Sequence, residues 1–159
     1  MNQNGEALQK IRKIGNYQFG KGVGSQLFPE NVEIVCSKNT GRIRHVFLND
    51  ELLATLRPTD GFFALTIAGA RRIMENVKPS RLWVKVITEA EEFVKAGRSV
   101  FAKHVVDADE EIRAGEEVIV IGEGDKVLAV GAAILTGREM KAFKRGAAVR
   151  VRRGIREES

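Results

Sequence analysis

Residues 117–152 read EVIVIGEGDKVLAVGAAILTGREMKAFKRGAAVRVR, and they organise the second half of the chain. The run from Val118 to Ile121 is apolar throughout, which is typical of a strand buried on both faces. The glycine-rich segment 122–125 predicts a hairpin turn into a return strand over 127–135, with Gly131 as a bulge or bend. Further short strands over 82–87 and 100–106 predict a compact β-barrel.

A short helix is predicted after this hairpin. Thr136 and Glu139 have the spacing of a capping box, in which each side chain satisfies a backbone N–H at the helix start. Gly146 is placed to end the helix, because glycine takes the left-handed conformation at little cost. Residues 147–152 then alternate between apolar residues and a face carrying arginine, the period of a half-buried strand.

Basic residues are concentrated in this last segment. Residues 136–156 carry eight lysines and arginines against one glutamate, whereas residues 80–135 carry seven basic and eleven acidic residues. The planar guanidinium of arginine donates two hydrogen bonds to a phosphate and keeps its charge. A solvated charged face is the alternative, but clustering on a helix and the adjoining strand favours nucleic acid as the partner.

The whole chain has 159 residues, a net charge of +5 and 43% hydrophobic residues, enough for one medium domain or two small ones. No apolar run approaches the roughly 18 residues of a membrane span. The N-terminus lacks the features of a signal peptide, so we expect a cytoplasmic protein without membrane association. The single cysteine, Cys36, ends an apolar run, and we expect a buried structural thiol there.

The first half predicts a small α+β module. A weak helical pattern precedes four short apolar runs separated by turn sequences, at 32–36, 42–48, 52–56 and 62–65. Thr66 is expected to cap a helix that runs to Val77. The segment 78–80 marks a boundary, so the fold class is α+β, with one domain over 1–79 and a barrel domain over 80–159.

The motifs of the second half occur in the order of a known family. EVIV at 117–120, LAVGA at 128–132 and GAAVRV at 146–151 resemble the PUA domain, the RNA-binding pseudo-barrel named after pseudouridine synthases and archaeosine transglycosylases. The resemblance covers roughly residues 80–155. It implies a PUA fold that binds structured RNA.

The first half extends the resemblance. YQFGKGVG at 17–24, SKNTGRIR at 37–44 and TLRPTDG at 55–61 resemble the module that precedes PUA in archaeal tRNA-guanine transglycosylase. Together the modules resemble the C-terminal part of that enzyme without its catalytic barrel. The resemblance implies archaeal origin, binding of the tRNA acceptor stem near its 3′ end, and a role beside a separate catalytic subunit of a tRNA-modification enzyme.

Candidate RNA-binding residues come from three places. The resemblance implies contacts from Lys103, His104, Arg113, Arg150 and Arg152, although residues 102–105 (AKHV) replace the Pro-Gly-Val-like stretch of many PUA domains. The basic segment itself adds Arg138, Lys141 and Arg153. The predicted hairpin at 37–44 adds Lys38, Arg42 and Arg44 as a second contact with the RNA backbone, unless it is simply a solvated turn.

No catalytic residue, metal or cofactor is expected. The segment 20–24 (GKGVG) lacks the spacing of a phosphate-binding loop, and Asp60 lies in a turn sequence where aspartate serves the backbone. Two histidines and one cysteine cannot supply an ordinary zinc site. We therefore predict a noncatalytic protein that binds tRNA. A protein-interaction or assembly factor in ribosome biogenesis or translation is the alternative, and a stand-alone modifying enzyme is a third reading.

Overall fold

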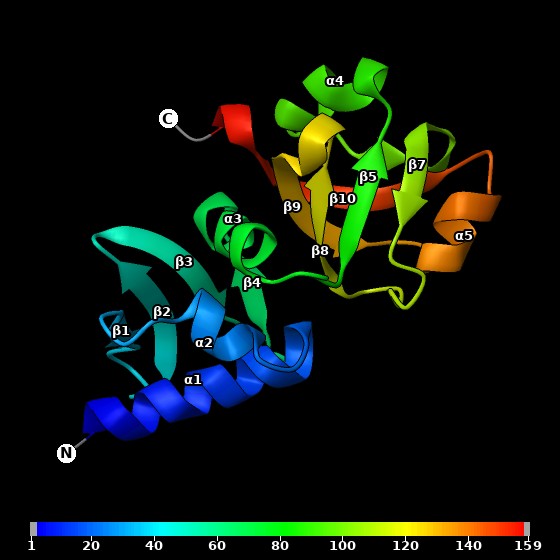
Figure 1. The fold of residues 1–159 in the computed structure, drawn as a ribbon. Coiled ribbons are helices and arrows are strands. Elements are labelled where there is room, and N and C mark those ends of the chain that lie inside the picture. Colours follow the sequence, from blue (N-terminus) through cyan, green and yellow to red (C-terminus); the bar gives the residue numbers. More distant parts are fainter. Residues whose placement is uncertain (1–2, 158–159) are drawn as a thin grey trace. The chain divides into compact units, whose positions relative to one another are not determined.

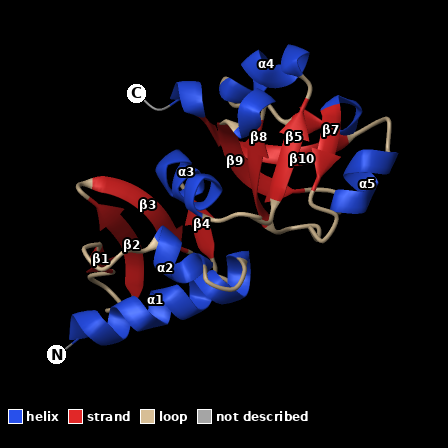
Figure 2. Cartoon of the chain, in the orientation of Figure 1, coloured by secondary structure: helices blue, strands red, loops and turns tan. Residues whose placement is uncertain are grey.

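The computed structural model describes residues 3–157, and the chain divides into two compact units after Pro79 (Figure 1). Each unit builds its own sheet and its own apolar core. Each unit combines helices with a largely antiparallel sheet (Figure 2), so the α+β fold class is confirmed.

The first unit is a four-stranded antiparallel sheet with three helices. Its strands pair in chain order, as a meander requires. The elements are α1 (Gln3–Phe19), α2 (Val23–Leu27), β1 (Glu33–Cys36), β2 (Ile43–Leu48), β3 (Glu51–Leu56), β4 (Phe63–Leu65) and α3 (Ile67–Asn76). Its core contains apolar side chains from the helices and from the sheet, including Ile11, Leu27, Phe28, Leu53, Phe63, Ile67 and Ile73.

The glycine-rich segment after α1 is a tight turn between two helices. Gly22 has a φ of 82°, which reverses the chain, and the Gly24 N–H donates to Asn16 Oδ1 at 2.7 Å. A Cβ on Gly24 would lie 2.1 Å from the carbonyl oxygen of Arg12. These glycines are therefore explained by the close packing of α2 on α1, and not by a nucleotide-binding loop.

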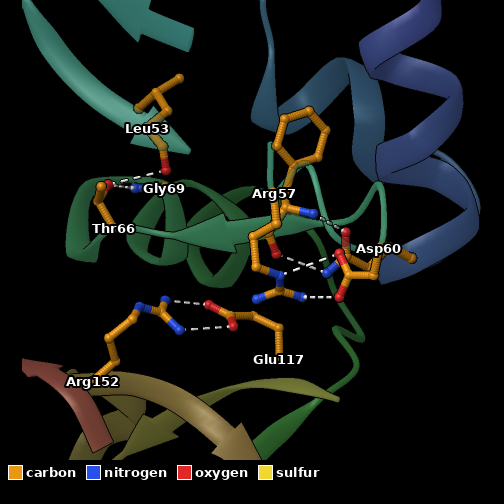
Figure 3. A network of polar contacts seen from close by, with 9 residues as sticks. Leu53, Arg57, Asp60, Thr66, Gly69, Glu117 and Arg152 are labelled. Atoms are coloured by element: carbon orange, nitrogen blue, oxygen red, sulfur yellow. Dashed lines mark hydrogen bonds and ion pairs between the residues drawn. The ribbon is translucent and has the colours of Figure 1, made fainter. Parts of the chain in front are cut away.

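The cap predicted at Thr66 is present. Its hydroxyl accepts from the Gly69 N–H at 3.1 Å, and it lies within donating distance of the Leu52 carbonyl at 2.6 Å and the Leu53 carbonyl at 3.0 Å (Figure 3). A Cβ on Gly69 would lie 2.2 Å from the Leu53 carbonyl oxygen. The threonine and the glycine together hold the start of α3 directly against β3.

The second unit is a six-stranded sheet that curls into a nearly closed barrel, as expected for a PUA domain. The strand order is β6-β10-β9-β8-β5-β7, antiparallel except for the β5–β8 pair. The strands and α-helices are β5 (Trp83–Val86), α4 (Glu91–Lys95), β6 (Val100–Phe101), β7 (Val105–Ala108), β8 (Glu117–Ile121), β9 (Val127–Ala133), α5 (Gly137–Ala142) and β10 (Ala147–Gly154). Short 3-10 turns lie at Thr88–Ala90, Ala102–His104, Glu123–Asp125 and Ile155–Glu157.

Two expected elements of the barrel are shorter than predicted. The strand over 100–106 is interrupted by the 3-10 turn at Ala102–His104, whose Ala102 N–H donates to the Gly146 carbonyl at 2.9 Å. Helix α5 begins with the predicted capping box but ends at Ala142, because Phe143 is already extended. Gly146, with a φ of 89°, therefore turns the chain into β10 and does not cap the helix.

The predicted hairpin strands are present, and Gly131 has a packing role. All five residues of β8 are buried. A Cβ on Gly131 would lie 2.2 Å from the carbonyl oxygen of Arg150 on β10. The register shift in this strand pair lies in β10, between Val151 and Arg153, so the bulge is opposite the glycine. Glycine is needed here because the two backbones approach closely.

The described residues overturn one further expectation. Cys36 is exposed, so the predicted buried thiol is wrong. It ends β1, which lies at the edge of its sheet and exposes three of its four residues. Over residues 3–157, no helix has the length and apolar character needed to cross a membrane.

Candidate nucleic-acid interface

Half of the cations in the basic segment 136–156 are paired with carboxylates. The acidic partners all come from the acid-rich segment that precedes it, 80–135. The pairs are Arg138–Glu110, Lys141 with both Asp107 and Glu110, Arg152–Glu117 and Arg156–Glu92. The opposite charges of the two segments therefore meet within one barrel, and only part of the positive charge is available to a ligand.

The pair between Arg152 and Glu117 joins β10 to β8, the two strands that flank β9. Glu117 is only 2% exposed, and both of its oxygens accept hydrogen bonds from the Arg152 guanidinium (Figure 3). The contact between Nη1 and Oε1 measures 2.9 Å. A buried carboxylate is tolerated only when it is paired, and a two-pronged guanidinium suits it best. The β10 bulge lies at Arg152, so the strand irregularity and the ion pair occur together.

Lys141 ties helix α5 to the segment that follows β7. Its Nζ lies 2.8 Å from Glu110 Oε2 and 3.2 Å from Asp107 Oδ1. The hydrogen bond from Lys141 holds the pKa of Glu110 below its ordinary value, and the bond to Glu110 raises the pKa of Lys141. Arg153 is also engaged, because its Nη1 donates to the Glu157 carbonyl at 2.9 Å.

Three exposed cations of the segment are unpaired among the described residues, and two of them lie beside the 3-10 turn at 102–104. Lys144, Arg145 and Arg150 make no ion pair within residues 3–157. The hydrogen bond from Ala102 to Gly146 places Lys103 next to the turn that carries Lys144 and Arg145. This arrangement brings together Lys103 with two cations that the family resemblance did not single out.

Aromatic side chains lie among these cations. Phe101 and Phe143 are each 46% exposed, and the rings of Phe101 and His104 meet edge to face with centroids 6.3 Å apart. Exposed aromatic rings beside cations are typical of surfaces that bind unpaired nucleotides. We call this surface the barrel patch: Phe101, Lys103, His104, Phe143, Lys144 and Arg145.

The other predicted residues of the barrel lie outside this patch. Arg150 is exposed on β10, and Arg113 is exposed in the turn that precedes β8. The backbone N–H of Arg113 donates to Glu116 Oε1 at 2.7 Å, which fixes the turn. Both guanidinium groups face solvent and have no ion pair among the described residues.

A second basic site lies wholly within the first unit. A pocket of about 410 Å³ forms between α1, the turn before β2 and the turn after β3. Predicted Arg42 and Arg44 both line it, together with two cations that were not predicted, Lys10 and Arg57. Lys38 is exposed on the same hairpin but does not line the pocket. We call this site the module pocket; its lining residues are Lys10, Thr40, Arg42, Ile43, Arg44, Leu56, Arg57, Pro58 and Gly61.

Asp60 organises one wall of the module pocket. Its Oδ1 accepts from the Phe62 N–H at 2.9 Å and from Arg57 Nε at 3.3 Å, and its Oδ2 lies 3.2 Å from Arg57 Nη2 (Figure 3). Burial works to raise the pKa of Asp60, but the hydrogen bonds from Phe62 and Arg57 together hold that pKa below its ordinary value. The carboxylate thus fixes the turn and positions Arg57, which is the backbone role expected from the sequence.

Family models match the two units separately. Residues 9–80 match the patch-forming domain C2 of tRNA-guanine transglycosylase, and residues 83–155 match the PUA domain. The residues that the structure describes contain no cluster of three histidine, cysteine or acidic residues that could hold a metal ion.

The chain is similar to curated enzymes of archaea. The chain is 42% identical to tRNA-guanine(15) transglycosylase of Methanothermobacter thermautotrophicus over 147 residues, covering 92% of this chain and 22% of the relative. It is 44% identical to the same enzyme of Pyrococcus abyssi over 149 residues, covering 94% of this chain and 25% of the relative. The chain therefore spans about a quarter of the length of these curated relatives, and it matches their C-terminal part.

Solved structures share the two-unit fold. A hypothetical protein of Pyrococcus horikoshii superposes with a TM-score of 0.78 at 24% identity, covering 96% of this chain and 92% of that one. A conserved PUA domain protein of Thermoplasma acidophilum gives a TM-score of 0.70 at 21% identity, covering 99% and 93% of the two chains. At these identities the likeness concerns the fold alone.

Proposed function

Because the chain joins a C2 domain of tRNA-guanine transglycosylase to a PUA domain, we propose that it is a noncatalytic protein that binds the acceptor stem and 3′ end of tRNA. The supporting relatives are enzymes that act on tRNA by name, and this chain matches the part of them formed by these two domains. Cytoplasmic location is part of the proposal, because its ligand is RNA.

The observation that carries the proposal is the barrel patch. Lys103, Lys144 and Arg145 are exposed cations around exposed aromatic rings, so they can hold phosphates while unpaired bases stack beside them. Arg113 and Arg150 add phosphate contacts at its margins. Arg138, Lys141, Arg152 and Arg153 are engaged within the barrel, and in this proposal they orient the RNA-facing strand and helix.

The proposal includes a partner that performs catalysis. The relatives are about four times as long as this chain, so most of each enzyme lies outside the matched part. We propose that the chain presents tRNA to a separate catalytic subunit of a transglycosylase-like modification enzyme. A base-exchange assay on the purified chain tests this directly, because turnover without a second chain would contradict the noncatalytic role.

The RNA assignment is tested by titrating intact tRNA and the same tRNA trimmed of its 3′ end at two salt concentrations. Contacts with several phosphates make affinity fall steeply with salt. We expect salt-sensitive binding that is lost on trimming. Equal binding of both RNAs would contradict recognition of the 3′ end, and no binding of either would favour the alternative of a protein-interaction or assembly factor.

A further inference from the structure

The module pocket concentrates positive charge in one small volume. Four of its nine lining residues are lysine or arginine and none is acidic. Lys10 comes from α1, Arg42 from the turn before β2, Arg44 from β2, and Arg57 from the turn after β3. Four cations drawn from three separate segments of the chain repel one another, and an anion in the pocket relieves that repulsion.

Three of these cations have no internal partner. Lys10, Arg42 and Arg44 make no ion pair within the described range of residues 3–157, whereas Arg57 is held by Asp60. The module pocket thus differs from the basic segment of the barrel, where carboxylates neutralise half of the charge. The unneutralised charge is available to a ligand.

The walls of the pocket are fixed before a ligand arrives. In the turn before β2, the Ser37 N–H donates to the Arg42 carbonyl at 2.7 Å and the Gly41 N–H donates to the Ser37 carbonyl at 2.8 Å. In the turn after β3, the Arg57 N–H donates to the Phe62 carbonyl and the Gly61 N–H to the Arg57 carbonyl, both at 2.9 Å. Two closed turns fix the backbone that carries Arg42 and Arg57, which lowers the cost of ordering these residues on binding.

The pocket also offers apolar surface. Ile43 and Leu56 are half-buried in its lining, and Pro58 adds a rigid ring. A volume of about 410 Å³ lies within the size range of small-ligand sites. Apolar surface beside guanidinium groups matches the two chemical parts of a nucleotide, a flat base and a phosphate.

We propose that the module pocket binds the 5′-terminal nucleotide of an RNA through its monophosphate. A terminal phosphomonoester carries about −1.5 to −2 charges at pH 7, whereas each internal phosphodiester carries one. The cluster of Lys10, Arg42, Arg44 and Arg57 therefore favours the end of a chain over its interior. Arg42 and Arg44 can each bind phosphate oxygens with two N–H groups.

Two stacked aromatic rings adjoin the pocket and can receive the base of the second nucleotide. Phe62 follows the pocket residue Gly61, and its ring stacks with that of Tyr17 at a centroid distance of 6.0 Å and an interplanar angle of 6°. The Tyr17 side chain is 80% exposed, although tyrosine normally buries much of its ring. A nucleotide leaving the pocket meets this open ring, on which its base can stack.

This inference rests on the proposed function as far as RNA is the source of the phosphate. The test compares two RNAs of the same sequence that end in a 5′-monophosphate or a 5′-hydroxyl, titrated against the full chain. We expect the phosphorylated RNA to bind roughly tenfold more tightly, because the terminal phosphate adds about 1.5 to 2 negative charges beside three unpaired cations. Equal binding of the two RNAs would overturn the inference while leaving RNA binding by the barrel patch intact.

Variants test whether the preference for the 5′-monophosphate arises in the module pocket. The double change Arg42→Ala and Arg44→Ala is expected to abolish the preference for the 5′-monophosphate while binding of the 5′-hydroxyl RNA stays near that of the wild type. Lys38→Ala is the matched control, since Lys38 is exposed on the same hairpin outside the pocket. A preference that survives the double change, in protein whose circular dichroism is unaltered, would overturn the assignment.

Competition by adenosine 5′-monophosphate distinguishes a pocket for an RNA end from a pocket for a free nucleotide. We expect the free nucleotide to compete only weakly, because it lacks the second base and the contacts of the barrel patch. Competition as strong as that of phosphorylated RNA would overturn the RNA-end assignment in favour of a free nucleotide. If neither RNA binds and adenosine 5′-monophosphate also fails to bind, the assignment of the module pocket as a phosphate site is overturned.

Discussion

The basic segment of the barrel and the module pocket have similar composition but differ in how much of their charge is free. In the basic segment 136–156, four of eight cations face carboxylates from the preceding segment. In the pocket, three of four lining cations have no ion pair among residues 3–157. A dense run of arginine and lysine in sequence therefore overstates the charge offered to a ligand, and a dispersed set can understate it.

The largest expected difference between a paired and a free cation is in the free energy of unfolding. Arg152→Ala leaves the buried Glu117 carboxylate without its guanidinium, and removing one partner of a buried pair costs about 3 kcal/mol or more. Arg150→Ala, two residues away on the same strand, removes an exposed side chain and is expected to change stability by about 0.5 kcal/mol or less. Urea denaturation of both variants measures the difference.

A third variant separates lost pairing from lost packing. Replacing the pair together, with Glu117→Leu and Arg152→Met, removes the uncompensated charge and is expected to recover most of the stability lost in Arg152→Ala. Equal destabilisation by Arg150→Ala and Arg152→Ala would show that the ion pair contributes nothing and that the barrel cations are equivalent. Because Arg152 supports the fold, Arg150 is the cleaner residue for tests of RNA binding.

The next contrast concerns affinity for RNA. The double change Lys144→Ala and Arg145→Ala removes two free cations of the barrel patch, and we expect roughly tenfold weaker binding of tRNA at low salt. The double change Arg138→Ala and Lys141→Ala removes the same formal charge from cations already paired with Glu110. A smaller loss is expected there, and equal losses would refute the distinction between free and paired cations.

Much of the fold was predictable because local rules and tertiary structure agree. The capping box at Thr136, the cap at Thr66 and the buried strand from Val118 are each encoded by a few neighbouring residues. The failures arise where distant backbone decides the outcome. The turn at Ala102–His104 depends on a hydrogen bond to Gly146, and the exposure of Cys36 depends on the place of β1 at the sheet edge.

The candidate sites likewise contain residues that a local pattern identifies and residues that only the tertiary structure brings in. Arg42 and Arg44 were predicted because they alternate along one strand beside a turn. Lys10 and Arg57 join them only after α1 and the turn after β3 are placed, and no local pattern marks either residue. Pairing is equally nonlocal, since Glu117 lies 35 residues from Arg152. Sequence therefore located the charged segments but not which of their charges are free.

A smaller difference between unpaired and paired cations is expected in the salt dependence of RNA affinity. Each cation that contacts a phosphate contributes about one unit to the slope of log affinity against log salt concentration. Arg42→Ala with Arg44→Ala is expected to reduce that slope by about two units for 5′-phosphorylated RNA. Lys141→Ala is expected to leave it nearly unchanged, because Lys141 is engaged by Asp107 and Glu110. Equal changes of slope would show that paired and unpaired cations contact RNA alike.

The smallest expected effect is the acid dependence of the Lys141–Glu110 pair. The hydrogen bond from Lys141 lowers the pKa of Glu110 in the folded chain, so the folded state binds fewer protons there than the unfolded state. Its contribution to stability is present above the ordinary pKa of 4.5 and is lost as pH falls through the lower folded value.

Glu110→Gln removes this carboxylate while keeping its shape, so its destabilising effect should be small at pH 7 and should shrink as the pH falls below the ordinary pKa of 4.5 towards pH 3. Urea midpoints of the wild type and the variant at both pH values measure that difference. A destabilisation by Glu110→Gln that persisted unchanged at pH 3 would show that the side chain acts through packing and not through its charge. Lys141 would then be grouped with the free cations, and the basic segment and the module pocket would differ less in their fraction of unpaired cations.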